Sequence, residues 1–101
     1  MSNGFVGIAC LDVNLPGSAT LKDRRSALAH VRRGLADRFG AAVAEVGDLD
    51  AAWRGSLTAA VVTRTQGDCD RRLAELEEWA LGCEEAVAVR LVRVVTPEDL
   101  A

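Results

Sequence analysis

The chain has 101 residues, of which 50% are hydrophobic and 27% charged, with a formal net charge of −3 at pH 7. This balance predicts one globular domain over residues 1–101 and excludes the low hydrophobicity and high net charge of a disordered chain. The first residues lack an export signal, no apolar run is long enough to span a bilayer, and the three cysteines match neither a disulfide framework nor a zinc motif, so we expect a cytoplasmic protein.

The first predicted element is a strand over residues 4–13, where both alternating sets of side chains are apolar, as in an interior strand. Pro16 and Gly17 then stop it, because proline cannot donate to a sheet and glycine tolerates turn geometry. Thr20 followed by Asp23 matches a capping box with aspartate in place of glutamate. A helix is therefore predicted to begin here.

This helix is amphipathic and is predicted to reach Phe39, with Gly40 ending it. Its apolar side, at about 100° per residue, consists of Leu21, Leu28, Val31, Leu35 and Phe39. The adjoining outward sector carries Lys22, Arg25, Arg32 and Arg33. Arg24 projects near the edge of the apolar side. Residues 22–38 hold six basic residues against two acids, so positive charge is concentrated on this helix in an otherwise acidic chain.

The second half of the chain adds two strands in a hairpin, another helix and a final strand. The hairpin strands are predicted over residues 41–46 and 57–65, joined by a connection that holds Trp53. Asp68 is predicted to cap the second helix, whose apolar side is Cys69, Leu73, Leu76, Ala80 and Cys83. The valine-rich residues 86–95 form the last predicted strand.

The predicted order is therefore strand, helix, strand, strand, helix, strand. Right-handed crossovers place both helices on one face of a four-stranded antiparallel sheet, which predicts an α+β, ferredoxin-like βαββαβ sandwich. The opposite sheet face has no cover. Apolar residues on such a face favour pairing with another copy, so we expect a homodimer.

Residues 15–26, with the sequence LPGSATLKDRRS, resemble the start of the YlxP-like family of small bacterial proteins of unknown function. Later landmarks occur in the same order, namely Arg38-Phe39, residues 43–46, Asp50, Trp53 and residues 59–62. The resemblance implies a ferredoxin-like fold. Genes of the family commonly lie near those for transcription-termination and translation-initiation factors, which implies work near RNA or ribosomes. Gly40, where the family commonly has asparagine, and Ala51-Ala52 depart from the pattern, which leaves open a specialised pathway.

The start of the first helix is the strongest candidate site for an anion. Free backbone amides and the positive end of the helix dipole meet Lys22, Arg24 and Arg25 there, and Arg32 and Arg33 extend the positive charge along a path that a phosphate backbone can follow. The alternatives are a basic face that is only solvated, a cap occupied by Asp23, and an Arg24 that pairs with Glu45 inside the fold. Few aromatic residues are available for stacking on single-stranded RNA.

Other chemistry-bearing residues favour structural roles. His30 lacks a relay partner in the sequence and is predicted to be a surface residue, and the cysteines are predicted to be small core residues. Glu45, Asp48 and Asp50 are better explained as solvated acids than as a magnesium site. Residues 16–18 lack the spacing of a phosphate-binding loop. We therefore expect no catalytic residue, no metal and no cofactor.

Three hypotheses about function remain. The first is a non-catalytic module that binds RNA or a ribosomal particle through the first helix. The second is a dimeric protein-interaction or regulatory subunit, for example in a biosynthetic pathway, that uses the open sheet face or Trp53. Tryptophan is enriched at interfaces, although more often such a residue covers a core edge. The third, by fold analogy alone, is a ligand or enzymatic site in the cavity of a dimer.

Overall fold

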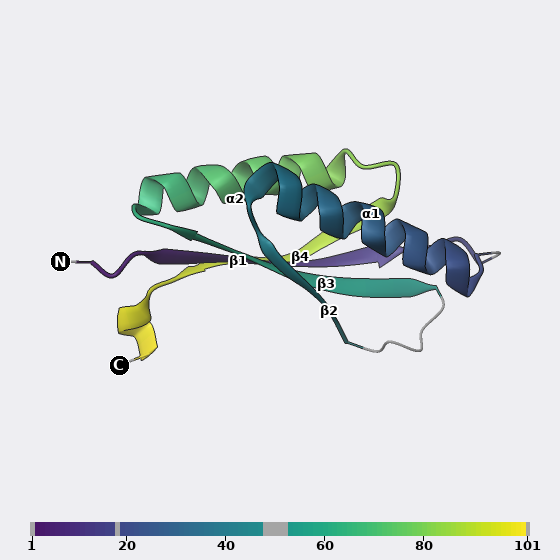
Figure 1. Ribbon diagram of the computed structural model, residues 1–101, viewed down its shortest axis with the longest axis horizontal. Coiled ribbons are helices and arrows are strands. Elements are labelled where there is room, and N and C mark those ends of the chain that lie inside the picture. Colours follow the sequence, from purple (N-terminus) through teal and green to yellow (C-terminus); the bar gives the residue numbers. More distant parts are fainter. Residues whose placement is uncertain (1, 18, 48–52, 101) are drawn as a thin grey trace.

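The computed structural model describes residues 2–17, 19–47 and 53–100. Its elements are β1 (Phe5–Asn14), α1 (Leu21–Phe39), β2 (Ala42–Val46), β3 (Arg54–Thr63), α2 (Gln66–Leu81), β4 (Ala86–Val95) and the short 3₁₀ helix η1 (Pro97–Leu100). The strands form one antiparallel sheet in the order β2-β3-β1-β4. Both α-helices lie on the same side of it (Figure 1). The predicted α+β ferredoxin-like arrangement is confirmed.

The core lies between the helices and the inner side of the sheet. Alternate residues of the central strands, such as Ala9 and Leu11 of β1 and Leu57 of β3, are almost completely buried there. The helices contribute Leu28, Val31 and Leu35 from α1 and Cys69, Leu73, Leu76 and Ala80 from α2. Burying each leucine contributes about 1.5–3 kcal/mol, so this shared layer is the main source of stability.

Both helices begin at a threonine that is followed three residues later by aspartate. The Thr20 hydroxyl accepts a hydrogen bond from the Asp23 amide at 3.1 Å, and the Asp23 carboxylate accepts one from the Thr20 amide at 2.9 Å. At α2 the cap is Thr65, whose hydroxyl accepts from the Asp68 amide, so the prediction of Asp68 as the cap was wrong. A hydroxyl cap satisfies amide donors that the helix leaves unpaired.

The bounds of two elements, β3 and α2, differ from the sequence prediction. Strand β3 begins at Arg54, three residues earlier than predicted, and ends at Thr63. It includes Gly55, where a Cβ atom would lie 2.5 Å from Leu28 Cδ2, so α1 sits directly on the bare backbone of the strand. Helix α2 ends at Leu81 with Gly82 as its C-cap. Cys83 therefore lies beyond the helix and is only half-buried.

The side of the sheet away from the helices, here named the open face, carries side chains in rows that run across the strands. The strand register gives the rows Val62-Val6-Val95, Ala42-Ala60-Ile8-Arg93, Ala44-Thr58-Cys10-Leu91, Val46-Ser56-Asp12-Ala88 and Arg54-Asn14-Ala86. The first three rows are mainly apolar, and Val62 is 75% exposed. No helix covers this face among the elements drawn in Figure 1, where η1 lies beside one end of it.

Neither helix in the described part of the chain combines the length and the apolar character needed to cross a membrane.

Candidate functional site

The five basic residues predicted to bind an anion separate into two groups. Arg24 is only 6% exposed, and its guanidinium lies 2.6 Å from the Glu45 carboxylate of β2. The expected alternative, in which Arg24 pairs with Glu45 inside the fold, is thus the one observed. Arg24 joins α1 to the edge strand and is not part of the outer surface that a large anion would touch.

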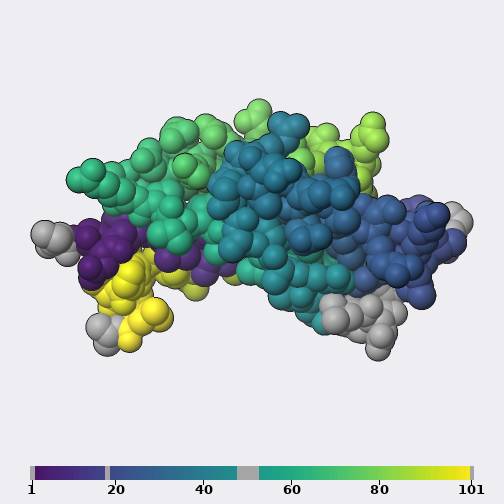
Figure 2. All heavy atoms as spheres, in the orientation of Figure 1, coloured from purple at the N-terminus to yellow at the C-terminus, as the bar shows by residue number. Residues whose placement is uncertain are grey.

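The other four residues, Lys22, Arg25, Arg32 and Arg33, are exposed and form what we name the basic face of α1. At 100° per residue they fall within a sector of about 100°, and at 1.5 Å per residue the face is about 16 Å long. Within residues 2–17, 19–47 and 53–100, no carboxylate lies within ion-pair distance of any of the four. Figure 2 shows α1, in blue, as an outer surface of the molecule.

The start of α1 contributes less to this site than its sequence suggested. The Asp23 carboxylate completes the capping box by accepting a hydrogen bond from the amide of the N-cap residue Thr20. Its negative charge also lies at the positive end of the helix dipole, which it partly neutralises. An anion at this surface would therefore meet side-chain cations along the helix, and the helix end would add little.

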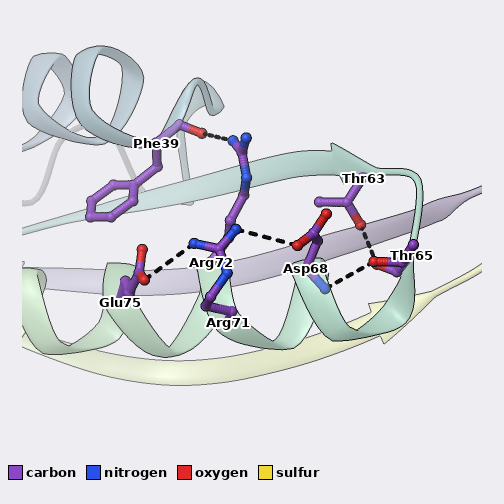
Figure 3. A network of polar contacts seen from close by, with 7 residues as sticks. All are labelled: Phe39, Thr63, Thr65, Asp68, Arg71, Arg72 and Glu75. Carbon is purple, nitrogen blue, oxygen red and sulfur yellow. Dashed lines mark hydrogen bonds and ion pairs between the residues drawn. The ribbon is translucent and has the colours of Figure 1, made fainter.

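The arginines of α2 show what paired cations look like in this fold. Arg71 lies between Asp68, at 3.3 Å, and Glu75, at 3.4 Å (Figure 3). The hydrogen bond to Asp68, followed by the charge of Glu75, raises the pKa of the Arg71 guanidinium. Arg72 donates to the Phe39 carbonyl oxygen at 2.9 Å and so ties α2 to the end of α1. Arg71 and Arg72 thus contact groups within the fold, whereas the four cations of the basic face do not pair with carboxylates of the described residues.

Trp53, the predicted anchor for a partner, lies on the surface beside the loop that leads into α1. Its side chain is 57% exposed, so it does not cover a core edge. The Trp53 carbonyl oxygen accepts a hydrogen bond from the Leu15 amide at 2.8 Å. The Arg54 guanidinium lies 4.9 Å from the centre of the indole ring, a cation–π distance.

A cleft of about 880 Å³ lies between α1 and the end of α2, and no sequence motif pointed to it. On one wall, His30 Nδ1 lies 2.8 Å from Glu85 Oε2, so the fold supplies a carboxylate 55 residues away along the chain. His30 is exposed, as predicted. The same cleft is lined by Asp37, Glu78 and Glu84 as well as Arg33 and Arg38, and this mixture of charges does not select an anion.

Trp79 fills the floor between the helices. It meets the ring of Phe39 edge to face, with centroids 6.1 Å apart, and Arg38 lies 5.5 Å from the centre of its ring. Trp79 also occupies the position that a side chain at Gly34 would take. This tryptophan therefore joins α1 to α2.

The nearby thiol is not activated. Burial, and then the charge of Glu85, raise the pKa of Cys83 against the opposing effect of Arg38. Its Sγ donates to the Trp79 carbonyl oxygen at 3.5 Å. A nucleophilic cysteine needs the opposite, a lowered pKa that favours the thiolate. The His30 and Glu85 pair thus lacks an activated partner at this cysteine.

Carboxylates in the described part of the chain do not assemble a metal site: no group of three or more His, Cys, Asp or Glu residues there could hold an ion. Glu45 is committed to Arg24. The other two members of the acidic cluster considered from the sequence, Asp48 and Asp50, lie outside the described residues.

Comparison with protein families identifies the chain. The sequence profile described as "Protein of unknown function (DUF503)" matches residues 6–93. The chain belongs to the DUF503 family. The match begins in β1 and ends in β4, so it contains both helices and the basic face of α1. No curated protein matches the sequence.

Proposed function

We propose that this DUF503 protein is a non-catalytic binding module that presents the basic face of α1 to RNA or to a ribosomal particle. The observation that supports this is the set of four exposed cations without carboxylate partners in the described chain. Lys22 and Arg25 lie on neighbouring turns, where like charges destabilise a helix by a few tenths of a kcal/mol. A bound polyanion offsets this repulsion and is attracted by all four cations.

The proposed contact is with the phosphate backbone. A face about 16 Å long can meet several successive phosphates, whereas sequence-specific recognition of unpaired bases relies on aromatic stacking. Among the described residues of the open face none is aromatic, since Phe5 packs against the core. Structured RNA is therefore a better ligand than a stacked single strand. The resemblance of residues 15–26 to YlxP-like proteins, whose genes lie near those of translation factors, supports a role near RNA or ribosomes.

The test compares two variants with matched loss of charge. Arg25→Gln/Arg32→Gln removes half of the basic face, and Arg64→Gln/Arg71→Gln removes two exposed arginines elsewhere. Binding to a labelled hairpin of ribosomal RNA and to purified ribosomal subunits is measured by fluorescence anisotropy and by cosedimentation. We expect the first variant to bind at least about tenfold more weakly, since each lost phosphate contact removes charge-assisted attraction, and the second to bind as the wild type does. Equal affinities of the two variants for RNA and for ribosomal subunits would contradict the proposal.

A second candidate function is favoured by the open face, whose first three rows are mainly apolar. Large exposed apolar patches mark interaction sites in soluble proteins. In this alternative the protein is a dimeric interaction or regulatory subunit, for instance in a biosynthetic pathway. Recovery of the same protein partners from a lysate before and after ribonuclease treatment would favour it over binding to RNA.

A further inference from the structure

We infer that the open face is the docking surface for a second copy of this chain, stacked sheet on sheet with a two-fold axis that runs along the strands between β1 and β3. This inference does not depend on the RNA proposal, because it uses the side of the molecule away from α1. The area of the open face supports a dimer, and the sizes of its side chains support this axis.

The area is sufficient for a specific dimer. Three of the strands have ten residues and β2 has five. With strands about 4.8 Å apart and about 3.4 Å per residue, the face covers roughly 600 Å² on each copy. Two such faces bury roughly 1,200 Å², the lower end of the range for specific protein interfaces.

The edges of the sheet are poorer docking surfaces than its face. The outer strand β4 shifts register opposite Cys10 and Leu11, which places a bulge at Arg90 in the middle of that edge. Bulges and charged residues on an edge strand prevent a second sheet from continuing it. The other edge, β2, has only five residues.

The sizes of the side chains are complementary about the proposed axis. Rotation about it places each row on the same row of the second copy, with β4 over β2 and β1 over β3. In the third row Leu91 of one copy then faces Ala44 of the other. In the second row Ile8 faces Ala60. Large residues thus meet small ones, as they do in well-packed cores. Stacked sheets usually cross at an angle of about 30°, which moves these pairs little near the centre of the interface.

Side-chain size also favours this axis over one that runs across the strands through the third row. The axis across the strands would lay β4 on β4 and bring Leu91 against Leu91 of the second copy, whereas at β2 Ala44 would meet only Ala44. In the proposed arrangement Arg93 faces Ala42, and Asp12 faces Ser56 of the second copy. Within one chain the Asp12 carboxylate already accepts a hydrogen bond from Ser56 at 2.8 Å and pairs with Arg90 at 3.5 Å.

The short β2 also leaves room for the C-terminus. Strand β2 begins at the second row, so the first row has no β2 member. The segment that follows Val95 turns into η1 on the side of the sheet away from the helices (Figure 1). Under the proposed axis, this segment of one copy lies opposite the place that β2 leaves empty in the other.

Oligomeric state gives the first test, by sedimentation equilibrium of the full chain. We expect the wild type at twice the 10.7 kDa chain mass. Ala44→Arg places an arginine on the exposed β2 surface opposite Leu91, and it acts twice in a symmetric dimer. It is expected to raise the dissociation constant at least about tenfold. The matched control, Ala74→Arg, alters another exposed alanine, on the outer side of α2, and should remain dimeric. Circular dichroism verifies that both variants are folded.

Cross-linking tests the axis itself. In a Cys10→Ala/Cys83→Ser background, Ala44→Cys and Leu91→Cys are combined and treated with a short bis-maleimide. The proposed axis predicts chains joined into dimers in the double variant and not in either single variant, because like positions then lie on opposite sides of the interface. A monomeric wild type at high micromolar concentration, a dimer unaffected by Ala44→Arg, or efficient cross-linking of a single variant would overturn the inference.

Discussion

The packing of Trp79 against Gly34 gives a prediction whose sign depends on one contact. A Cβ atom at Gly34 would overlap the indole ring of Trp79, which lies between Phe39 and Arg38. Replacing a glycine inside a helix with alanine ordinarily stabilises the helix by about 1 kcal/mol. Overpacking costs about 1–3 kcal/mol. We therefore expect Gly34→Ala to destabilise the protein by about 1 kcal/mol, a fall in Tm of about 4–8 °C for a domain of this size.

The same substitution should reverse its sign once the ring is removed. In a Trp79→Ala background, Gly34→Ala is expected to stabilise the protein by about 1 kcal/mol, which gives a coupling free energy of about 2 kcal/mol. Urea unfolding followed by far-UV circular dichroism measures all four proteins without relying on tryptophan fluorescence. Gly67→Ala is the control in α2, because nothing lies within 4 Å of a Cβ atom there. Stabilisation by Gly34→Ala in both backgrounds would refute the proposed contact.

Three further predictions concern the cap, the C-terminus and the thiol. Thr20→Ala removes the capping hydroxyl of α1 and should lower the free energy of unfolding by about 1 kcal/mol in urea titrations; no change would mean that the capping box is not formed in solution. Hydrogen bonds from its own backbone amide and from the Asn3 amide lower the pKa of Glu98. Its contribution to folding stability is therefore present above the ordinary glutamate pKa and is lost as pH falls through the lowered value. NMR titration should find the midpoint of Glu98 below that of an unstructured glutamate, and an equal midpoint would contradict the contact. Burial raises the pKa of Cys83, so iodoacetamide at neutral pH should modify it more slowly than a free cysteine, whereas faster modification would indicate an activated thiol.

Local sequence patterns were sufficient to predict the fold. Valine-rich runs, two amphipathic segments and the turn at Pro16 and Gly17 determine the order of elements, and the crossover rule then determines the architecture. The cap of α2 was also visible, since Thr65 precedes Asp68 at the same spacing as Thr20 precedes Asp23. The prediction for α2 was wrong because it assigned the cap to the Asp68 carboxylate, whereas the Thr65 hydroxyl caps the helix.

Features that depend on packing between distant segments could not be predicted in this way. Gly55 looks unsuitable for a strand until Leu28 of α1 is seen to rest on it. The contact between His30 and Glu85 joins segments 55 residues apart and follows no periodicity. For Arg24 the sequence left two alternatives open, an anion-binding role and a pair with Glu45, and the position of Glu45 on β2 decides for the pair.

The salt dependence of RNA binding tests the proposed role of α1 most directly. Four phosphate contacts with a duplex predict that the logarithm of the binding constant falls with the logarithm of salt concentration with a slope of about −3.6, so a fourfold rise in salt weakens binding about 150-fold. Arg25→Gln/Arg32→Gln should halve that slope while Arg64→Gln/Arg71→Gln leaves it unchanged. A wild-type slope near zero, or the same slope in all three proteins, would contradict the account.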